Sequence, residues 1–174
     1  TKTHWQVAPI GNKSLQVLIS KDTLKATFLE NGVITLAELQ SPSKTGTIIK
    51  TEFAYQQDEH FTGLGHGFYG REPKLDLKGQ RTGRNYGKQP IEQAPLIVPF
   101  YLSSKGYGVF LNSTFTNEFS FGDKEEYSVA IDDHGFSGQM DYFYISGGKL
   151  ANVLDNYTQL TGRPRLPAKS MFGL

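Results

Sequence analysis

The sequence predicts an all-β fold of the sandwich class, with a single helix near its C-terminal end. Three observations indicate this class. About ten short segments alternate apolar and polar residues or are rich in β-branched and aromatic residues. Turn residues separate these segments at close spacing, and 19 glycines in 174 residues suit short strands joined by tight turns. Only one segment carries apolar residues at helical spacing.

The first third of the chain predicts antiparallel strands. Leu24, Ala26 and Phe28 fall on one face of a strand, and this period of two is typical of a half-buried strand. Asn31-Gly32 follows and favours a tight hairpin, because both residues tolerate positive φ. The predicted strands are 15–20, 23–30, 33–39 and 47–53, with Lys21-Asp22 as a two-residue connection between the first two and 41–43 as a break.

Two glycine-rich stretches between residues 60 and 93 predict long connections, which in compact domains are often functional loops. A short strand is predicted between them at 74–77. Strands then resume, and Asp132 to Gly135 is predicted as a turn. The later predicted strands are 98–103, 107–111, 118–121, 127–131 and 140–145.

The predicted helix covers 150–160, and it is followed by residues that end helices. Gly162 occupies the position of a C-terminal glycine cap, and Pro164 prevents the helix from resuming. The sequence ends on Met171, Phe172 and Leu174, which we interpret as the start of a buried strand. The apolar stripe of the helix consists of Leu150, Val153, Leu154, Tyr157 and Leu160.

Composition argues against several classes of function. The net charge is +1, and the densest basic stretch, Lys78 to Lys88, is too short to favour nucleic-acid binding over a solvated loop. Cysteine is absent, which excludes disulfides, thiolate metal sites and a cysteine nucleophile. No apolar run approaches the roughly 18 residues of a membrane span, so no membrane partner is expected. The cellular compartment is not readable from the sequence.

No self-contained catalytic, metal or cofactor site is predicted. None of the four histidines, His4, His60, His66 and His134, has a partner at metal-ligand spacing. Residues 63–68 lack the full glycine pattern and the βαβ context of a dinucleotide-binding loop. Glycoside hydrolysis needs paired carboxylates. The candidate carboxylates lie in predicted turns and are interpreted as solvated charges: Asp58-Glu59, Asp123 with Glu125-Glu126, and Asp132-Asp133.

A series of segments in the second half resembles the N-terminal domains of glycoside hydrolase family 31. The last of them, 160–167 (LTGRPRLP), is similar to the linker by which that family enters its catalytic barrel. The order and spacing of these segments over about 110 residues carry the resemblance, whereas the first 60 residues match only in being strands. The others are 63–65 (GLG), 75–79 (LDLKG), 98–101 (VPFY), 106–112 (GYGVFLN), 141–144 (DYFY) and 153–157 (VLDNY).

This resemblance implies a galactose-mutarotase-like β-supersandwich, with one C-terminal helix leading into a (β/α)₈ barrel that the sequence does not contain. The implied domains are 1–148 for the sandwich, 149–167 for the helix and linker, and 168–174 for the start of the first barrel strand. The family's two catalytic aspartates, which act in a retaining mechanism, would lie beyond Leu174. The resemblance therefore implies a non-catalytic domain of an α-glycosidase acting on α-linked glucosides, xylosides or related oligosaccharides, with its own barrel as partner.

The resemblance also implies a contact with substrate through one loop. In many family members a loop after the Leu-Asp-Leu-x-Gly segment touches the leaving-group sugar, often through Trp-Asn-x-Asp. Arg84, Asn85, Tyr86 and Gly87 occupy that place here, and only Asn85 matches. The usual carboxylate contact is thus in doubt, whereas Tyr86 is a side chain that stacks on sugars and Arg84 one that donates hydrogen bonds.

Two other functions are compatible with a sandwich of this kind. An aldose epimerase needs a facing acid and base, and His66, His134 and Glu92 are present but lie in no epimerase motif. A free-standing carbohydrate-binding module needs an exposed aromatic platform. The only tryptophan, Trp5, is expected in a frayed N-terminus and argues weakly against such a module.

Overall fold

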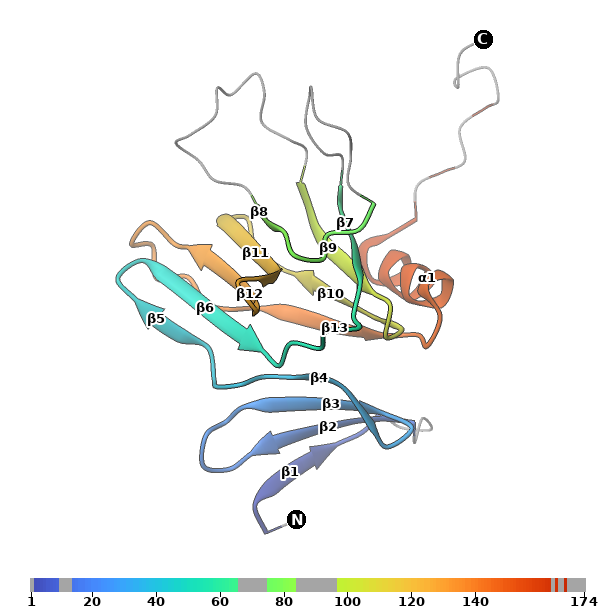
Figure 1. Cartoon of the computed structure of the whole chain (residues 1–174), viewed down its shortest axis with the longest axis horizontal. Coiled ribbons are helices and arrows are strands. Elements are labelled where there is room, and N and C mark those ends of the chain that lie inside the picture. The colour runs from blue at the N-terminus through green and yellow to red at the C-terminus, as the bar shows by residue number, and fades with distance from the viewer. Residues whose placement is uncertain are drawn as a thin grey trace.

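The computed structural model describes residues 2–9, 14–65, 75–83, 97–163, 165 and 168. These residues form thirteen strands and one helix, which confirms the predicted all-β class (Figure 1). The strands are β1 His4–Val7, β2 Leu15–Ser20, β3 Ala26–Glu30, β4 Val33–Ala37, β5 Ser43–Thr45, β6 Ile48–Phe53, β7 Phe61–Gly65, β8 Arg81–Gly83, β9 Ile97–Ser103, β10 Tyr107–Leu111, β11 Thr116–Asp123, β12 Glu126–Asp132 and β13 Tyr142–Ser146; the helix is α1 Leu150–Thr161.

The strands make three antiparallel sheets. The N-terminal sheet has the order β1-β2-β3-β4, the second sheet β13-β10-β9-β7 and the third sheet β5-β6-β12-β11-β8. The second and third sheets pack face to face, and the N-terminal sheet lies beside them at one end of the molecule (Figure 1). The helix covers the outer side of the second sheet, where it contacts β13, β10 and β9.

Two of the predicted turns have different outcomes. The hairpin at Asn31-Gly32 is confirmed, with φ of 52° and 80°, the left-handed values that this two-residue turn requires. The two-residue connection at Lys21-Asp22 is wrong. Ser20 N–H bonds to Lys25 C=O at 3.0 Å, and β3 begins only at Ala26. The loop is therefore longer, and Leu24 turns out of the strand with φ of 56° and 60% exposure.

The segments that sequence patterns assign least well are the short ones. The predicted strand at 74–77 is wrong for its described residues, since 75–77 are not in a strand. The expectation of a frayed N-terminus is also wrong, because Trp5 lies in β1 and pairs with Ile19 of β2. Both errors have one cause: such short segments gain or lose strand structure through a neighbour rather than through their own residues.

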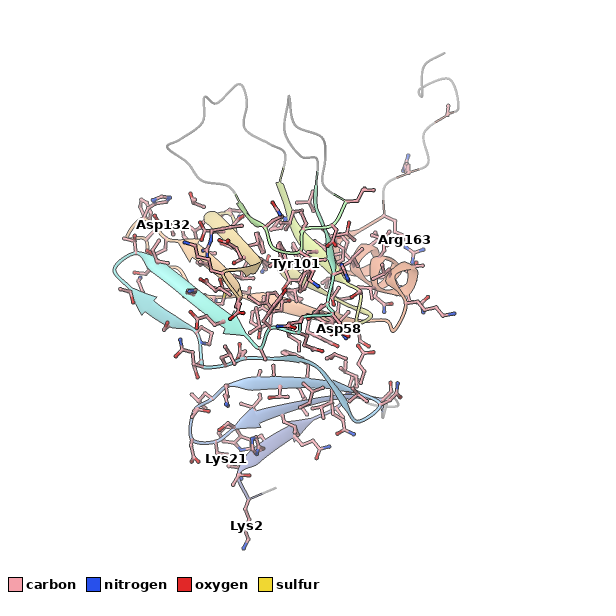
Figure 2. The ribbon with its side chains drawn as sticks, viewed as in Figure 1. Lys2, Lys21, Asp58, Tyr101, Asp132 and Arg163 are labelled. Atoms are coloured by element: carbon pink, nitrogen blue, oxygen red, sulfur yellow. The ribbon has the colours of Figure 1, made fainter. Side chains whose placement is uncertain are left out.

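The main core lies between the second and third sheets and is rich in aromatic rings. Tyr101 stands at its centre (Figure 2), with Phe121 at 5.0 Å and Phe61 at 6.0 Å between ring centroids. Both contacts are edge-on, the arrangement that aromatic pairs favour. Close packing of these rings sets the spacing between the two sheets.

The N-terminal sheet is joined to the rest of the domain through side chains of β13 and through backbone hydrogen bonds between the ends of β4 and β6. Phe28 of β3 stacks on Tyr144, with 4.4 Å between centroids and 12° between planes. Two tyrosine hydroxyls then donate to glutamates of the N-terminal sheet: Tyr144 to Glu30 and Tyr142 to Glu38, each at 2.7 Å. Ring stacking and these hydrogen bonds together fix the sheet in place.

The helix packs on the second sheet through a narrower stripe than its sequence indicates. Val153 is fully buried, and Tyr157 stacks on Phe100 with 3.8 Å between centroids. A side chain at Gly108 of β10 would come within 2.8 Å of both Phe100 and Val153, so glycine is what lets the helix approach. The remaining leucines, Leu150, Leu154 and Leu160, are 40–51% exposed. The helix ends at Gly162, as predicted, with φ of 97°.

Candidate functional site

The segment before the predicted substrate loop is held firmly against the sandwich. The Asp76 carboxylate accepts hydrogen bonds from the backbone N–H groups of Lys78 at 3.0 Å and Phe61 at 3.4 Å, and its other oxygen lies 2.6 Å from His60 Nδ1. Leu77 and Gly79 donate backbone N–H groups to Phe61 and Phe121. The Leu-Asp-Leu-Lys-Gly segment is thus a backbone anchor that contacts both β7 and β11.

Arg81 fixes the short edge strand β8 that follows this anchor. Its guanidinium donates to Glu118 at 2.7 Å, Asp123 at 3.0 Å and Glu126 at 2.9 Å. One planar group with five N–H donors suits this arrangement, because its donors diverge in fixed directions from a rigid plane. β8 therefore ends at Gly83 in a fixed position, opposite Glu118 of β11.

The candidate substrate residues Arg84, Asn85 and Tyr86 lie outside the described residues, as do His66, Glu92 and the last residues of the sequence. Their roles stay predictions. Of the basic stretch, Lys78 donates to the carbonyl of Gln57 and Arg81 binds its three carboxylates. These two cations are therefore engaged within the domain.

Glu59 is not the solvated turn charge that its sequence context predicts. Its side chain is fully buried, and Oε1 accepts hydrogen bonds from Ser103 and, at 2.6 Å, from the Tyr107 hydroxyl. Its Oε2 has no partner among the described residues. Desolvation raises the pKa of Glu59, and the hydrogen bonds from Ser103 and Tyr107 oppose it. Residues 58 and 59 are thus an exposed and a buried carboxylate side by side.

Three tyrosines extend the buried network from Glu59 into the core. The Tyr127 hydroxyl lies 3.0 Å from that of Tyr107 and 2.6 Å from that of Tyr101. If each hydroxyl donates toward Glu59, Tyr101 donates to Tyr127, Tyr127 to Tyr107, and Tyr107 to the carboxylate. Each hydroxyl in the network then donates one hydrogen bond. Desolvation raises the pKa of each phenol, so all three stay protonated. This network has no solvent access, so its role is structural.

The other candidate carboxylates serve turns and ion pairs. Asp133 is fully buried, which corrects its interpretation as a solvated charge. Its oxygens bind Lys44 at 2.5 Å and the N–H groups of Gly135 and Gly138 at 2.9 Å. The hydrogen bond from Lys44, followed by those from the backbone, lowers the pKa of Asp133. Asp58, by contrast, is exposed and pairs with Lys105 at 2.6 Å, as a solvated charge should.

The described histidines make pairwise contacts. His60 contacts Asp76, and His134 lies 3.1 Å from the Thr116 hydroxyl. Within the described ranges no three histidine, aspartate or glutamate side chains form a group suited to a metal ion. No helix in the described part of the chain has the length and apolarity to cross a membrane.

Sequence analysis missed a groove beside the helix. It has a volume of about 720 Å³ and lies between α1, β13 and the β3–β4 turn. Asn152, Asn156 and Phe143 are among its lining residues, and Asn31 borders it from the N-terminal sheet. Asn31 is more than 100 positions from the other three residues in sequence, and no local pattern connects it to them.

Comparison with known proteins identifies what this fold is similar to. The family model of the glycosyl hydrolase 31 N-terminal galactose mutarotase-like domain matches residues 4–120. An isomaltosyltransferase of Sporosarcina globispora is 30% identical over 95% of this chain and 16% of its own length. The α-xylosidase XylQ of Lactiplantibacillus pentosus is 31% identical over 97% of this chain and 23% of its own. The chain therefore spans less than a quarter of these relatives.

Solved structures agree on the fold. The GH31 dextranase FjDex31A of Flavobacterium johnsoniae, complexed with glucose, superposes with a TM-score of 0.78 at 22% identity, over 96% of this chain and 20% of its own. A cycloalternan-forming enzyme from Listeria monocytogenes superposes with a TM-score of 0.76 at 24% identity, over 97% of this chain and 17% of its own. At these identities the likeness establishes the mutarotase-like architecture.

Proposed function

Because this chain belongs to the family of glycosyl hydrolase 31 N-terminal galactose mutarotase-like domains, we propose that it is the non-catalytic N-terminal domain of an α-glycosidase. The intact enzyme would hydrolyse α-linked glucosides, xylosides or related oligosaccharides. The observation that carries the proposal is the family match over residues 4–120, supported by relatives aligned to almost the whole chain.

The division of labour follows from the chemistry. A retaining glycosidase needs two carboxyl groups about 5 Å apart on either side of the scissile bond. The carboxylates described above are buried or paired with cations, and they hold this sandwich together: Glu59 inside the core, Asp133 in a turn and Glu126 on Arg81. We therefore assign the reaction to a (β/α)₈ barrel following this chain. In this proposal 1–148 are the sandwich, 149–167 the helix and linker, and 168–174 the first barrel strand.

Hydrolysis of aryl α-glycosides tests this proposal. We expect the 174-residue chain to release no aryl group from the α-glucoside, α-xyloside or α-galactoside, and the longer native polypeptide to hydrolyse at least one of them. The preferred glycoside would name the sugar. Turnover by the 174 residues alone would refute the non-catalytic role, and no turnover by the longer polypeptide would refute the glycosidase assignment.

We further propose that the loop after β8 shapes the leaving-group subsite, through Arg84, Asn85 and Tyr86. The firm anchoring of Asp76 and Arg81 supports this, because a substrate contact needs a fixed base. In the intact enzyme, Arg84→Ala or Tyr86→Ala should lower kcat/KM for disaccharides by about tenfold or more. The loss of kcat/KM for aryl glycosides should be smaller. An aryl leaving group makes fewer contacts in that subsite. Equal losses on both substrates would remove the subsite role.

A further inference from the structure

The groove between α1, β13 and the β3–β4 turn carries acceptors in fixed orientations. Asn152 Nδ2 donates to the carbonyl of Gly147 at 3.1 Å, and Asn156 Nδ2 donates to that of Ser146 at 2.8 Å. Each amide nitrogen is thus committed to the backbone. The amide oxygens have no donor among the described residues and are left as acceptors one helical turn apart.

The carboxylates that line the groove are already engaged. Asp155 binds Arg163 at 2.5 Å and Gln159 at 2.7 Å, and Glu30 accepts the Tyr144 hydroxyl at 2.7 Å. The described lining contains no lysine, arginine or histidine, so nothing there attracts an anion. The Arg163 guanidinium offsets the charge of Asp155, and the Tyr144 hydroxyl occupies one oxygen of Glu30. The groove therefore favours a neutral ligand that donates hydrogen bonds.

An aromatic ring completes the groove. Phe143 lies on the edge strand β13 and is 39% exposed, because α1 covers the neighbouring residues of the sheet but not this one. Its ring is nearly parallel to Phe110, 22° between planes with 6.0 Å between centroids, which restricts its rotation. A pyranose has the matching chemistry, since its C–H face packs on an aromatic ring while its hydroxyls donate at the rim.

We propose that this groove binds an α-linked oligosaccharide; the linkage class rests on the proposed function. β13 is an edge strand of the second sheet, whereas β8, which leads into the predicted substrate loop, is an edge strand of the third. Figure 1 shows α1 and the β3–β4 turn on the same flank of the molecule. A site of this kind on the N-terminal domain would hold a polymeric substrate close to the enzyme.

An NMR titration of the 174-residue chain with isomaltotriose and with maltotriose tests the proposal. We expect saturable shifts of amide signals in α1, β13 and Asn31 with at least one of the two. Phe143→Ala should weaken this binding by about tenfold. Phe136→Ala, which removes a ring that is 78% exposed and lies outside this groove, should leave it unchanged.

A second variant keeps the test decisive if Phe143→Ala does not fold. Leu160→Lys changes a half-exposed residue in the last helical turn, where a cation is well tolerated, and places a long side chain in the groove. It too should weaken binding. Absent shifts with both sugars, shifts centred elsewhere, or unchanged affinity in both variants would overturn the groove site. Hydrolysis by the longer polypeptide is measured separately, so this failure would leave the proposed function standing.

Discussion

Asp58 and Glu59 are neighbours in sequence but titrate in different surroundings. The Lys105 ammonium lowers the pKa of Asp58, which is exposed, whereas desolvation raises the pKa of Glu59, which is buried. A carboxyl group with a raised pKa in the folded state stabilises the fold fully below its unfolded value of 4.5. That contribution is lost as the pH rises through the folded value.

The first prediction concerns this pH dependence. We expect the free energy of unfolding of the wild type to fall relative to Glu59→Gln as the pH rises from about 4.5 to about 8, by at most about 1.4 kcal/mol per pH unit. Urea unfolding at several pH values measures the difference. Asp58→Asn is the control and should show a flat difference over this range, because the Asp58 contribution is lost only at lower pH. Parallel curves for the wild type and Glu59→Gln would contradict the prediction.

Among the secondary-structure elements, β8 is a short edge strand that depends on a side chain as well as on backbone pairing. It has three residues and pairs only with β11, so Arg81 supplies much of its attachment. Partial burial alone would raise the pKa of Glu126. The hydrogen bonds from Lys50, Ser128 and Arg81 outweigh this effect of burial and lower the pKa of Glu126 to about 2. The stability this carboxylate contributes is therefore complete above its unfolded pKa of 4.5 and lost as the pH falls toward 2.

The second prediction is that Arg81→Ala lowers the free energy of unfolding by about 1–2 kcal/mol and speeds hydrogen exchange of the β8 amides. High salt should reduce the cost, since the charges are partly exposed. Arg163→Ala removes an exposed pair with Asp155 and should cost no more than about 0.5 kcal/mol. Equal effects of the two substitutions, measured by urea unfolding, would show that Arg81 has no special role.

The helix offers a matched pair of adjacent residues for the third prediction. Val153→Ala opens a cavity under α1 and should cost about 1–3 kcal/mol, because Val153 is fully buried between the helix and β10. Leu154→Ala removes a larger side chain that is 47% exposed and should change the free energy of unfolding by no more than about 0.5 kcal/mol. Chemical denaturation distinguishes them, and a larger cost for Leu154 would mean that α1 packs differently.

For the whole molecule, the attachment of the N-terminal sheet is the feature most open to test. Phe28 of this sheet stacks on Tyr144 of β13, and its side chain belongs to the main buried cluster. The sheet is also held by the glutamate–tyrosine hydrogen bonds to β13 and by backbone hydrogen bonds between the ends of β4 and β6. An element held by few contacts opens locally before the core does.

The fourth prediction is that Phe28→Ala costs about 3 kcal/mol and exposes the amides of β1–β4 to exchange before those of β9–β12. Hydrogen exchange followed by mass spectrometry reports both regions at once. Leu29→Ala lies on the opposite face of the same strand and should change neither region by more than about 1 kcal/mol. Uniform loss of protection across all sheets would show that the three sheets open as one unit.

Sequence alone determined the elements whose signals are local. Short segments rich in apolar, β-branched and aromatic residues predicted β2, β9 and β10, helical spacing predicted α1, and Asn31-Gly32 predicted the hairpin, because each depends on residues within a few positions of one another. The family, too, was readable from ordered segments of the second half. The substrate loop at 84–86 stays a prediction.

The tertiary structure decided what the charged and short segments do. Arg81 meets its carboxylates 37 to 45 positions away, Glu59 is buried by strands more than 40 positions downstream, and the groove beside α1 joins Asn31 to Asn152. Short strands such as β1 and β8 exist through pairing rather than propensity. The burial of a side chain and the pairing of a short strand depend on residues that are distant in sequence. A local sequence pattern therefore does not predict them.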